Sequence, residues 1–225
     1  MKHTQTTRCK ARRHPEVRLS YEPDGIPDVD VRWLLDHIEA IVAHGEVLRV
    51  GETIRIGWVD LEIGRVDKGM LQLLEPDWSG VIPLTCVPWV TETLRQLRRQ
   101  RDVVDSLGLI DEILFPNICE SGLVCSRLNL GEMGVMERLE PEGADSGWFV
   151  GCADTGHAHD EPAELERVSL YQAACWIPAS VQFYALPAGC RVDVVEGLRV
   201  SREGKEIHVA PGSYLERLRL RSSDA

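Results

Sequence analysis

The stretch from Asp145 to Asp160 constrains the fold of this chain most, because it joins a turn, a strand and a polar loop. It begins with the acidic turn Asp145-Ser146-Gly147 and continues into the apolar run Trp148–Cys152, which predicts a short buried strand. The loop that follows contains two aspartates and two histidines: Asp154, His157, His159 and Asp160. The chain must therefore hold a polar loop at the end of a rigid strand.

Short apolar runs separated by turn residues dominate the second half. Residues 123–128 and 133–138 predict two paired strands. Further strands are expected at 181–186, 191–195, 198–202 and 206–209, the last two joined by a hairpin turn at Glu203-Gly204-Lys205. Apolar residues at helical spacing predict a helix over Glu164–Trp176.

The first half combines helices with a hairpin. Asp28 or Asp30 is expected to cap a helix that ends near His44, and a second helix is expected from Pro88 to about Ser106. Between them, residues 52–63 alternate as a strand does, and the turn Asp67-Lys68-Gly69 leads into residues 70–74. These patterns predict the α+β class, with a mostly antiparallel sheet, a few helices and two small subdomains.

Charge divides the chain unevenly. The first twenty residues contain six basic and one acidic residue, whereas the remainder carries a net charge of −16. We expect residues 1–20 to form a basic disordered tail, 21–108 an N-terminal α+β subdomain and 109–225 a C-terminal α+β domain. The acidic body should be repelled by nucleic acid and by anionic membranes, and should attract a basic protein partner.

Hydropathy and cysteine content indicate a cytoplasmic protein. No apolar run approaches the ~18 residues that a membrane span needs, and no hydrophobic segment follows the basic N-terminal residues as it does in a secretory signal. The seven cysteines include no CxxC pair. We expect core thiols instead of disulfides or a zinc site.

The loop after Cys152 raises the question of a metal site. Cys152, Asp154, His157 and His159 could supply ligands, and the two histidines resemble the start of the HxHxD run of binuclear metallohydrolases. The residue two positions beyond His159 is Glu161, however, and no further histidine precedes His208. We therefore expect no metal and no cofactor. A hydrolase centred on His157, His159 and Asp154 or Asp160 stays open as an alternative.

A second loop combines acidic residues with a tryptophan. Glu75 and Asp77 precede Trp78 in a turn after an expected strand. Tryptophan is a frequent anchor of binding hot spots, because it buries a large apolar area and still donates a hydrogen bond. This loop is therefore a candidate contact with a protein partner.

Three short elements stand in a fixed order in the second half: Met136-Glu137-Arg138, Ser146-Gly147-Trp148 and Leu186-Pro187-Ala188-Gly189. Cys119–Cys125, Gly134-Val135, Ser169–Ala173 and Ile177-Pro178 accompany them. Over about residues 115–195, this pattern resembles immunity protein family thirty-three of bacterial polymorphic-toxin systems.

The resemblance implies a non-enzymatic protein that binds a cognate toxin and occludes its catalytic domain. A basic nuclease effector of a contact-dependent secretion system, acting in the cytosol, is the leading expectation for the toxin. NAD-consuming or ADP-ribosylating toxins come second, and a regulatory binding module with another partner stays open. The expected toxin-binding residues come from loops in both halves: Glu75, Asp77, Trp78, Asp154, His157, His159, Asp160, Glu161 and Glu164.

Overall fold

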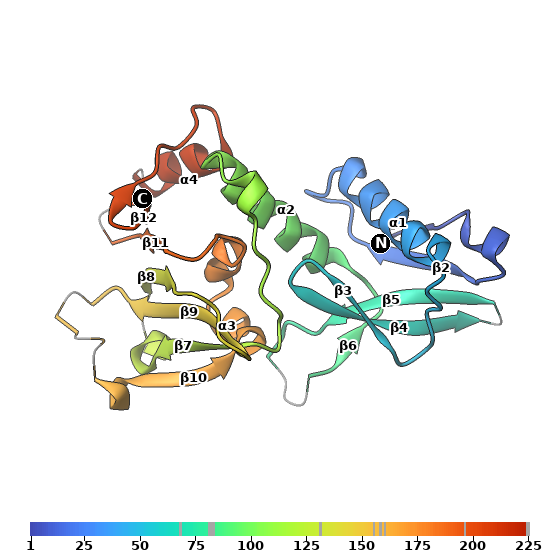
Figure 1. Ribbon diagram of the computed structural model, residues 1–225, viewed down its shortest axis with the longest axis horizontal. Helices are drawn as coiled ribbons and strands as arrows, with labels where there is room; N and C mark the ends of the chain where they lie inside the picture. The colour runs from blue at the N-terminus through green and yellow to red at the C-terminus, as the bar shows by residue number, and fades with distance from the viewer. Residues whose placement is uncertain are drawn as a thin grey trace. The chain divides into compact units, whose positions relative to one another are not determined.

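A computed structural model describes residues 1–225 except 68, 81–83, 131, 155, 158, 160, 196 and 224–225 (Figure 1). The chain forms two compact units, Met1–Arg98 and Arg99–Ala225. The boundary between them falls within helix α2 (Thr91–Ser106), whereas the sequence analysis placed it after residue 108. Helix α2 ends where the sequence predicted, and Gly108 follows with a φ of 69°.

The first unit contains a mixed sheet in the order β1-β2-β5-β4-β3, with β6 beside β5. Its strands are β1 (Lys2–Gln5), β2 (Glu16–Tyr21), β3 (Thr53–Ile56), β4 (Val59–Asp67), β5 (Met70–Pro76) and β6 (Cys86–Val87). The expected β4–β5 hairpin is confirmed, and its turn residue Lys68 lies outside the described residues. Helix α1 (Asp28–Ala43) also forms as predicted and buries Leu34, Ile38 and Val42. Neither aspartate caps α1: its N-cap residue is Pro27, which makes no side-chain cap.

The first twenty residues are ordered, and the prediction of a disordered basic tail is wrong. Strand β1 pairs with β2, and a 3₁₀ turn (Cys9–Arg12) joins the two strands. The alternation of Val17, Leu19 and Tyr21 gives β2 a fully buried apolar side. The prediction of a disordered tail rested on the net charge of residues 1–20 and did not take this alternation into account. The carboxylate of Glu39 in α1 also accepts the backbone N–H groups of Thr7 and Arg8 and pairs with the Arg8 side chain.

Glu75 lies inside the first unit, although the sequence analysis placed it in an exposed binding loop. Its side chain has no exposed surface, because this residue lies next to the last residue of β5 and faces the N-terminus of helix α2. The two carboxylate oxygens accept the backbone N–H groups of Glu92 (3.1 Å) and Thr93 (2.7 Å). These are among the donors that a helix N-terminus leaves unsatisfied. Glu75 is thus a structural cap and is not available to a partner.

Burial makes this cap sensitive to pH. Burial raises the pKa of Glu75 to about 7, against the opposing effect of the Thr93 and Glu92 N–H groups. Because the folded pKa exceeds the ordinary value of 4.5, the folded protein holds the proton more tightly than the unfolded chain. Its contribution to stability is complete below that ordinary value and is lost as pH rises through about 7.

We therefore expect the free energy of unfolding to fall by on the order of 2 kcal/mol between about pH 5 and pH 7.5. Urea denaturation across this range measures the change. The variant Glu75→Gln, which cannot titrate, should show a flatter profile, and Glu52→Gln, at an exposed position, should leave the slope unchanged. Equal slopes for Glu75→Gln and the unsubstituted protein would contradict the assignment.

The second unit is built on a sheet in the order β10-β7-β9-β8-β11-β12-β13 (Figure 1). Its strands are β7 (Ser121–Cys125), β8 (Met133–Arg138), β9 (Asp145–Cys152), β10 (Leu165–Ser169), β11 (Cys190–Asp193), β12 (Arg199–Arg202) and β13 (Lys205–Glu206). Helices α3 (Leu170–Trp176) and α4 (Tyr214–Ser223) and several 3₁₀ turns complete it. Strands β7 and β9 run parallel, and the other neighbours are antiparallel.

Two predicted elements of this unit have the wrong type. The helix expected over Glu164–Trp176 begins only at Leu170, because Ser169 is its N-cap and accepts the Gln172 N–H, while Leu165–Ser169 extends as β10. The strand expected at 181–186 is instead a 3₁₀ helix (Pro178–Phe183) that begins at a proline. A short continuous apolar run does not distinguish these two possibilities by periodicity.

The elements that carried the family resemblance meet around Arg138. Its buried guanidinium donates to the carbonyl oxygens of Leu114 (2.6 Å), Tyr184 (3.0 Å) and Leu186 and lies over the Trp148 ring. The Trp148 indole N–H donates to the Tyr184 carbonyl at 3.2 Å. These motifs therefore build the core of the second unit and are not a catalytic site.

The predicted class is confirmed. Helices and two mixed sheets make an α+β protein, in which most neighbouring strands are antiparallel. Within the described parts of the chain, no helix combines the length and the apolar character needed to cross a bilayer.

Candidate functional site

Several strands of the second unit end close together at one end of its sheet. Strands β7 and β9 are parallel, so their C-terminal residues Cys125 and Cys152 lie side by side. Strand β8 is antiparallel to β9 and begins there, at Met133. The connection from β9 to β10 leaves the sheet at this end, at the left of Figure 1. This is the polar loop expected from the sequence.

Cys125, Cys152, His157 and His159 form a compact cluster at this end. One donor atom from each of the four lies within 4.8 Å of every other. Nδ1 of His157 is 3.4 Å from Sγ of Cys125 and 3.3 Å from Sγ of Cys152, and Nε2 of His159 is 3.5 Å from the Cys152 sulfur. Two thiols and two imidazoles are a donor set that suits a soft or borderline metal ion.

Burial favours the neutral forms of Cys152 and His159. It raises the pKa of the Cys152 thiol and lowers the pKa of the His159 imidazole, in the second case with the nearby His157 acting in the same direction. A thiol of this kind is a poor nucleophile, because the thiolate is the reactive form.

Arg127 pairs with two acidic residues beside the cluster. Its guanidinium lies 3.3 Å from Asp154 and 3.7 Å from Glu164. Glu164 also lies 3.3 Å from Nε2 of His157. The loop is therefore less acidic at its surface than its sequence suggests, because a basic residue from the β7–β8 connection offsets part of its charge.

The predicted site residues fall into three groups. His157 is buried and His159 is half-buried in the cluster. Asp154 and Glu161 are exposed and Glu164 is half-buried, so these three present carboxylates at or near the surface. Asp160 lies outside the described residues.

The remaining candidates belong to the first unit. Asp77 is half-buried and accepts the Ser79 N–H at 2.9 Å in a local turn. The half-buried Trp78 stacks on the buried Trp58, with ring centroids 5.6 Å apart. Much of Trp78 is thus engaged in packing.

Cys125 is the member of the cluster that the sequence analysis did not identify. Cys125 is far from Cys152 and the loop histidines in the sequence, because a 3₁₀ turn (Ser126–Leu130) and two strands lie between them. No short sequence motif therefore contains all four residues. The parallel pairing of β7 with β9 closes that distance. The interpretation of both thiols as inert packing missed this convergence.

Two hollows open beside β8 and β11. One, of about 400 Å³, contains Cys152, His157 and His159 with Arg191 and Asp193. The other, of about 440 Å³, is mostly apolar, and its lining includes Met133 of β8 and Val194, which follows β11. Successive residues of a strand point to opposite faces. Accordingly, Met133 and Gly134 line different hollows, as do Val194 and Val195.

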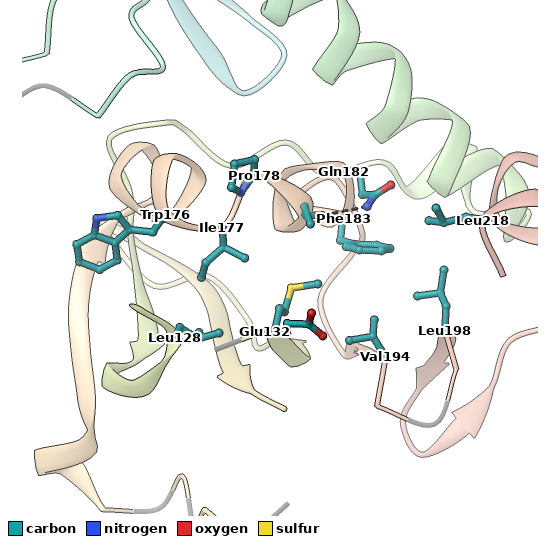
Figure 2. A pocket seen from close by; sticks show the side chains of 12 residues that line it. Leu128, Glu132, Trp176, Ile177, Pro178, Gln182, Phe183, Val194, Leu198 and Leu218 are labelled. Atoms are coloured by element: carbon teal, nitrogen blue, oxygen red, sulfur yellow. Dashed lines mark hydrogen bonds between the residues drawn. The ribbon is translucent and has the colours of Figure 1, made fainter. Parts of the chain in front are cut away.

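The apolar hollow is shown in Figure 2. Ile177, Phe183, Val194 and Leu198 surround it, with Trp176 at one end and Leu218 of α4 at the other. Trp176 keeps 38% of its surface exposed. This hollow combines apolar walls with an accessible aromatic side chain, and both properties suit the binding of a partner side chain.

Comparison with protein families gives one match, to the Imm33-like domain over residues 99–203. Comparison with curated proteins and with solved structures gives no match. The matched range begins where the second unit begins and includes strands β7 to β12, the Arg138 core, the polar hollow and every residue that lines the apolar hollow except Leu218. The second unit therefore contains an Imm33-like domain, and the resemblance to an immunity protein family that its motifs indicated is confirmed.

Proposed function

We propose that this protein is an immunity protein that binds a cognate toxin and neutralises it by covering the toxin's catalytic domain. The observation that carries the proposal is the Imm33-like match over residues 99–203. An immunity protein needs a stable surface and no chemistry of its own. The buried motif residues of the second unit fit that requirement, because they stabilise the fold instead of lining a reactive cleft.

The end of the sheet with the two hollows is the proposed contact surface. Trp176 at the rim of the apolar hollow is the anchor, because exposed tryptophans beside apolar pockets dominate the energetics of many interfaces. The exposed carboxylates of Asp154 and Glu161 stand on the neighbouring loop. Asp77 and Trp78 of the first unit are a separate proposed contact with the toxin.

A basic toxin suits the charge of this protein. The chain carries a formal net charge of −11, so a basic partner would be attracted over long range and would associate faster at low salt. Nucleases present basic surfaces because they bind phosphate. We therefore propose a nuclease acting in the cytosol, where the immunity protein would also reside, as the partner.

Co-expression with the toxin encoded beside this gene tests the proposal. We expect the protein to rescue growth and to co-purify with the toxin domain. Trp176→Ala should weaken binding by at least about tenfold, whereas Trp33→Ala, at a similarly exposed tryptophan of the first unit, should leave binding unchanged. Calorimetric titration measures both. If the protein neither rescues growth nor forms a complex, the proposal is wrong.

A further inference from the structure

Three separations among the four donors at the end of β7 and β9 are close to those of a tetrahedral metal site, and all four donor atoms lie within 4.8 Å of one another. Zinc lies about 2.3 Å from thiolate sulfur and about 2.0–2.1 Å from imidazole nitrogen. Tetrahedral angles then place sulfur and nitrogen about 3.6 Å apart. The observed sulfur–nitrogen distances are 3.3, 3.4 and 3.5 Å. Small shifts of the side chains would therefore complete the coordination.

We propose that Cys125, Cys152, His157 and His159 bind a structural zinc ion. The ligand atoms are the two sulfurs, Nδ1 of His157 and Nε2 of His159. Each thiol releases its proton on binding, so two thiolates, two neutral imidazoles and Zn²⁺ form a centre without net charge. A neutral centre suits this buried position, where Cys125, Cys152 and His157 are almost completely covered.

The surroundings of His157 support this assignment. Its buried Nε2 lies 3.3 Å from the Glu164 carboxylate and makes no hydrogen bond to any of the described residues. Metal-bound histidines commonly donate their second ring N–H to a carboxylate, which fixes the ring and its tautomer. Glu164 is in turn positioned by Arg127 and by the Ser126 hydroxyl. Protonation on Nε2 leaves Nδ1 as the unprotonated nitrogen that faces both sulfurs.

His159 is also held in place. Its ring lies edge-on to Phe149 and 4.7 Å from the His157 ring, measured between centroids. The backbone N–H of Cys152 lies 3.3 Å from its Nε2 and makes a weak contact that metal binding would replace. Packing thus orients two imidazoles toward two thiols, which a simple apolar core would not require.

The ion would anchor the β9–β10 connection to the sheet. Cys125 and Cys152 end two strands, whereas His157 and His159 belong to the loop. Four protein ligands fill a tetrahedral site and leave no position for a water molecule, as in structural zinc sites. Such a site does not support hydrolysis, which needs an open position. The ion instead fixes the loop that carries Asp154 and Glu161.

Metal analysis of the full chain, purified with a reductant, tests the proposal. We expect one zinc per chain, or uptake of one Zn²⁺ on titration after removal by a chelator, with a fall in melting temperature when zinc is removed. Replacement by Co²⁺ should give the absorption bands of a tetrahedral site together with thiolate charge transfer. These measurements use the unsubstituted protein, so they test the proposal even if a variant fails to fold.

Substitutions identify the ligands. Cys125→Ser and Cys152→Ser should each weaken Zn²⁺ binding at least about 100-fold, and Glu164→Gln should weaken it about 10-fold or more. Cys119→Ser and His208→Ala, at exposed positions outside the cluster, should bind as the unsubstituted protein does. The proposal is overturned if the reduced protein takes up no zinc, if uptake survives both cysteine substitutions, or if Cys125 and Cys152 form a disulfide in the presence of the reductant. None of these measurements involves a toxin, so they are independent of the proposed immunity function.

Discussion

Replacing Arg138 with alanine is expected to lower the free energy of unfolding of the second unit by about 3–5 kcal/mol. The guanidinium is 1% exposed and donates to three carbonyl oxygens from two segments, at Leu114 and at Tyr184 and Leu186. Truncation removes this donor from the Leu114 and Leu186 carbonyls, at about 1–3 kcal/mol each, whereas the Tyr184 carbonyl keeps the Trp148 indole N–H. It also removes the cation from the face of Trp148.

Urea denaturation followed by tryptophan fluorescence measures the effect, because Trp148 lies 5.5 Å from the guanidinium. Burial lowers the pKa of Arg138 only to about 10, so the charge is present at neutral pH. Arg138→Lys keeps the charge but loses the planar guanidinium that lies over the Trp148 ring, and should recover only part of the loss. Arg191→Ala is the matched control, since this exposed arginine pairs with Glu137 on the same sheet and should change stability by less than about 1 kcal/mol. If Arg138→Ala is as mild as this control, the buried guanidinium does not organise the core.

The Arg138 core shows what sequence patterns reveal and what they leave out. The elements containing Arg138, Trp148 and Leu186 carried the family resemblance, and it was confirmed. Their spacing did not indicate that they contact one another, because those contacts depend on tertiary folding. Nor did the resemblance show that these residues are structural. That followed from their burial and from the carbonyl groups they satisfy.

Local patterns predicted the elements better than the exposure of their residues. Segments with a periodic apolar pattern, such as α1, β8 and the β4–β5 hairpin, formed as expected, although neither predicted aspartate caps α1. The predicted exposure of Glu75 was wrong because its proline and tryptophan neighbours indicate a turn, while the helix that covers Glu75 begins sixteen residues later in the sequence, at Thr91. Only part of the four-donor cluster could be recognised in the sequence. Cys152 and the histidines are neighbours in sequence, but Cys125 joins them only through the parallel pairing of β7 with β9.

The second large effect is expected for Gly134→Val, at the point where the core meets the cluster. Gly134 lies at an irregularity in the β8–β9 pairing, between Met133 and Val135. A Cβ atom there would stand 2.4 Å from the carbonyl oxygen of Cys152 and 2.5 Å from Cα of Ala153. Both are backbone atoms, so no side-chain rotation can relieve the clash, and the end of β9 must move.

We expect Gly134→Val to lower the free energy of unfolding by about 3 kcal/mol or more and to weaken Zn²⁺ binding, because the displaced residue Cys152 is a proposed ligand. Gly156→Ala is the control in the β9–β10 loop, where an added Cβ meets only the Asp154 side chain, at 3.3 Å. Urea denaturation and Zn²⁺ titration of the two variants separate the alternatives. A loss of stability with unchanged zinc affinity would mean that β9 adjusts away from the cluster, and a variant as stable as the unsubstituted protein would mean that the strands do not approach as closely as the structure indicates. A joint loss would tie the glycine of the family motif to the metal-bearing end of the sheet, through a backbone contact that any side chain larger than hydrogen would disrupt.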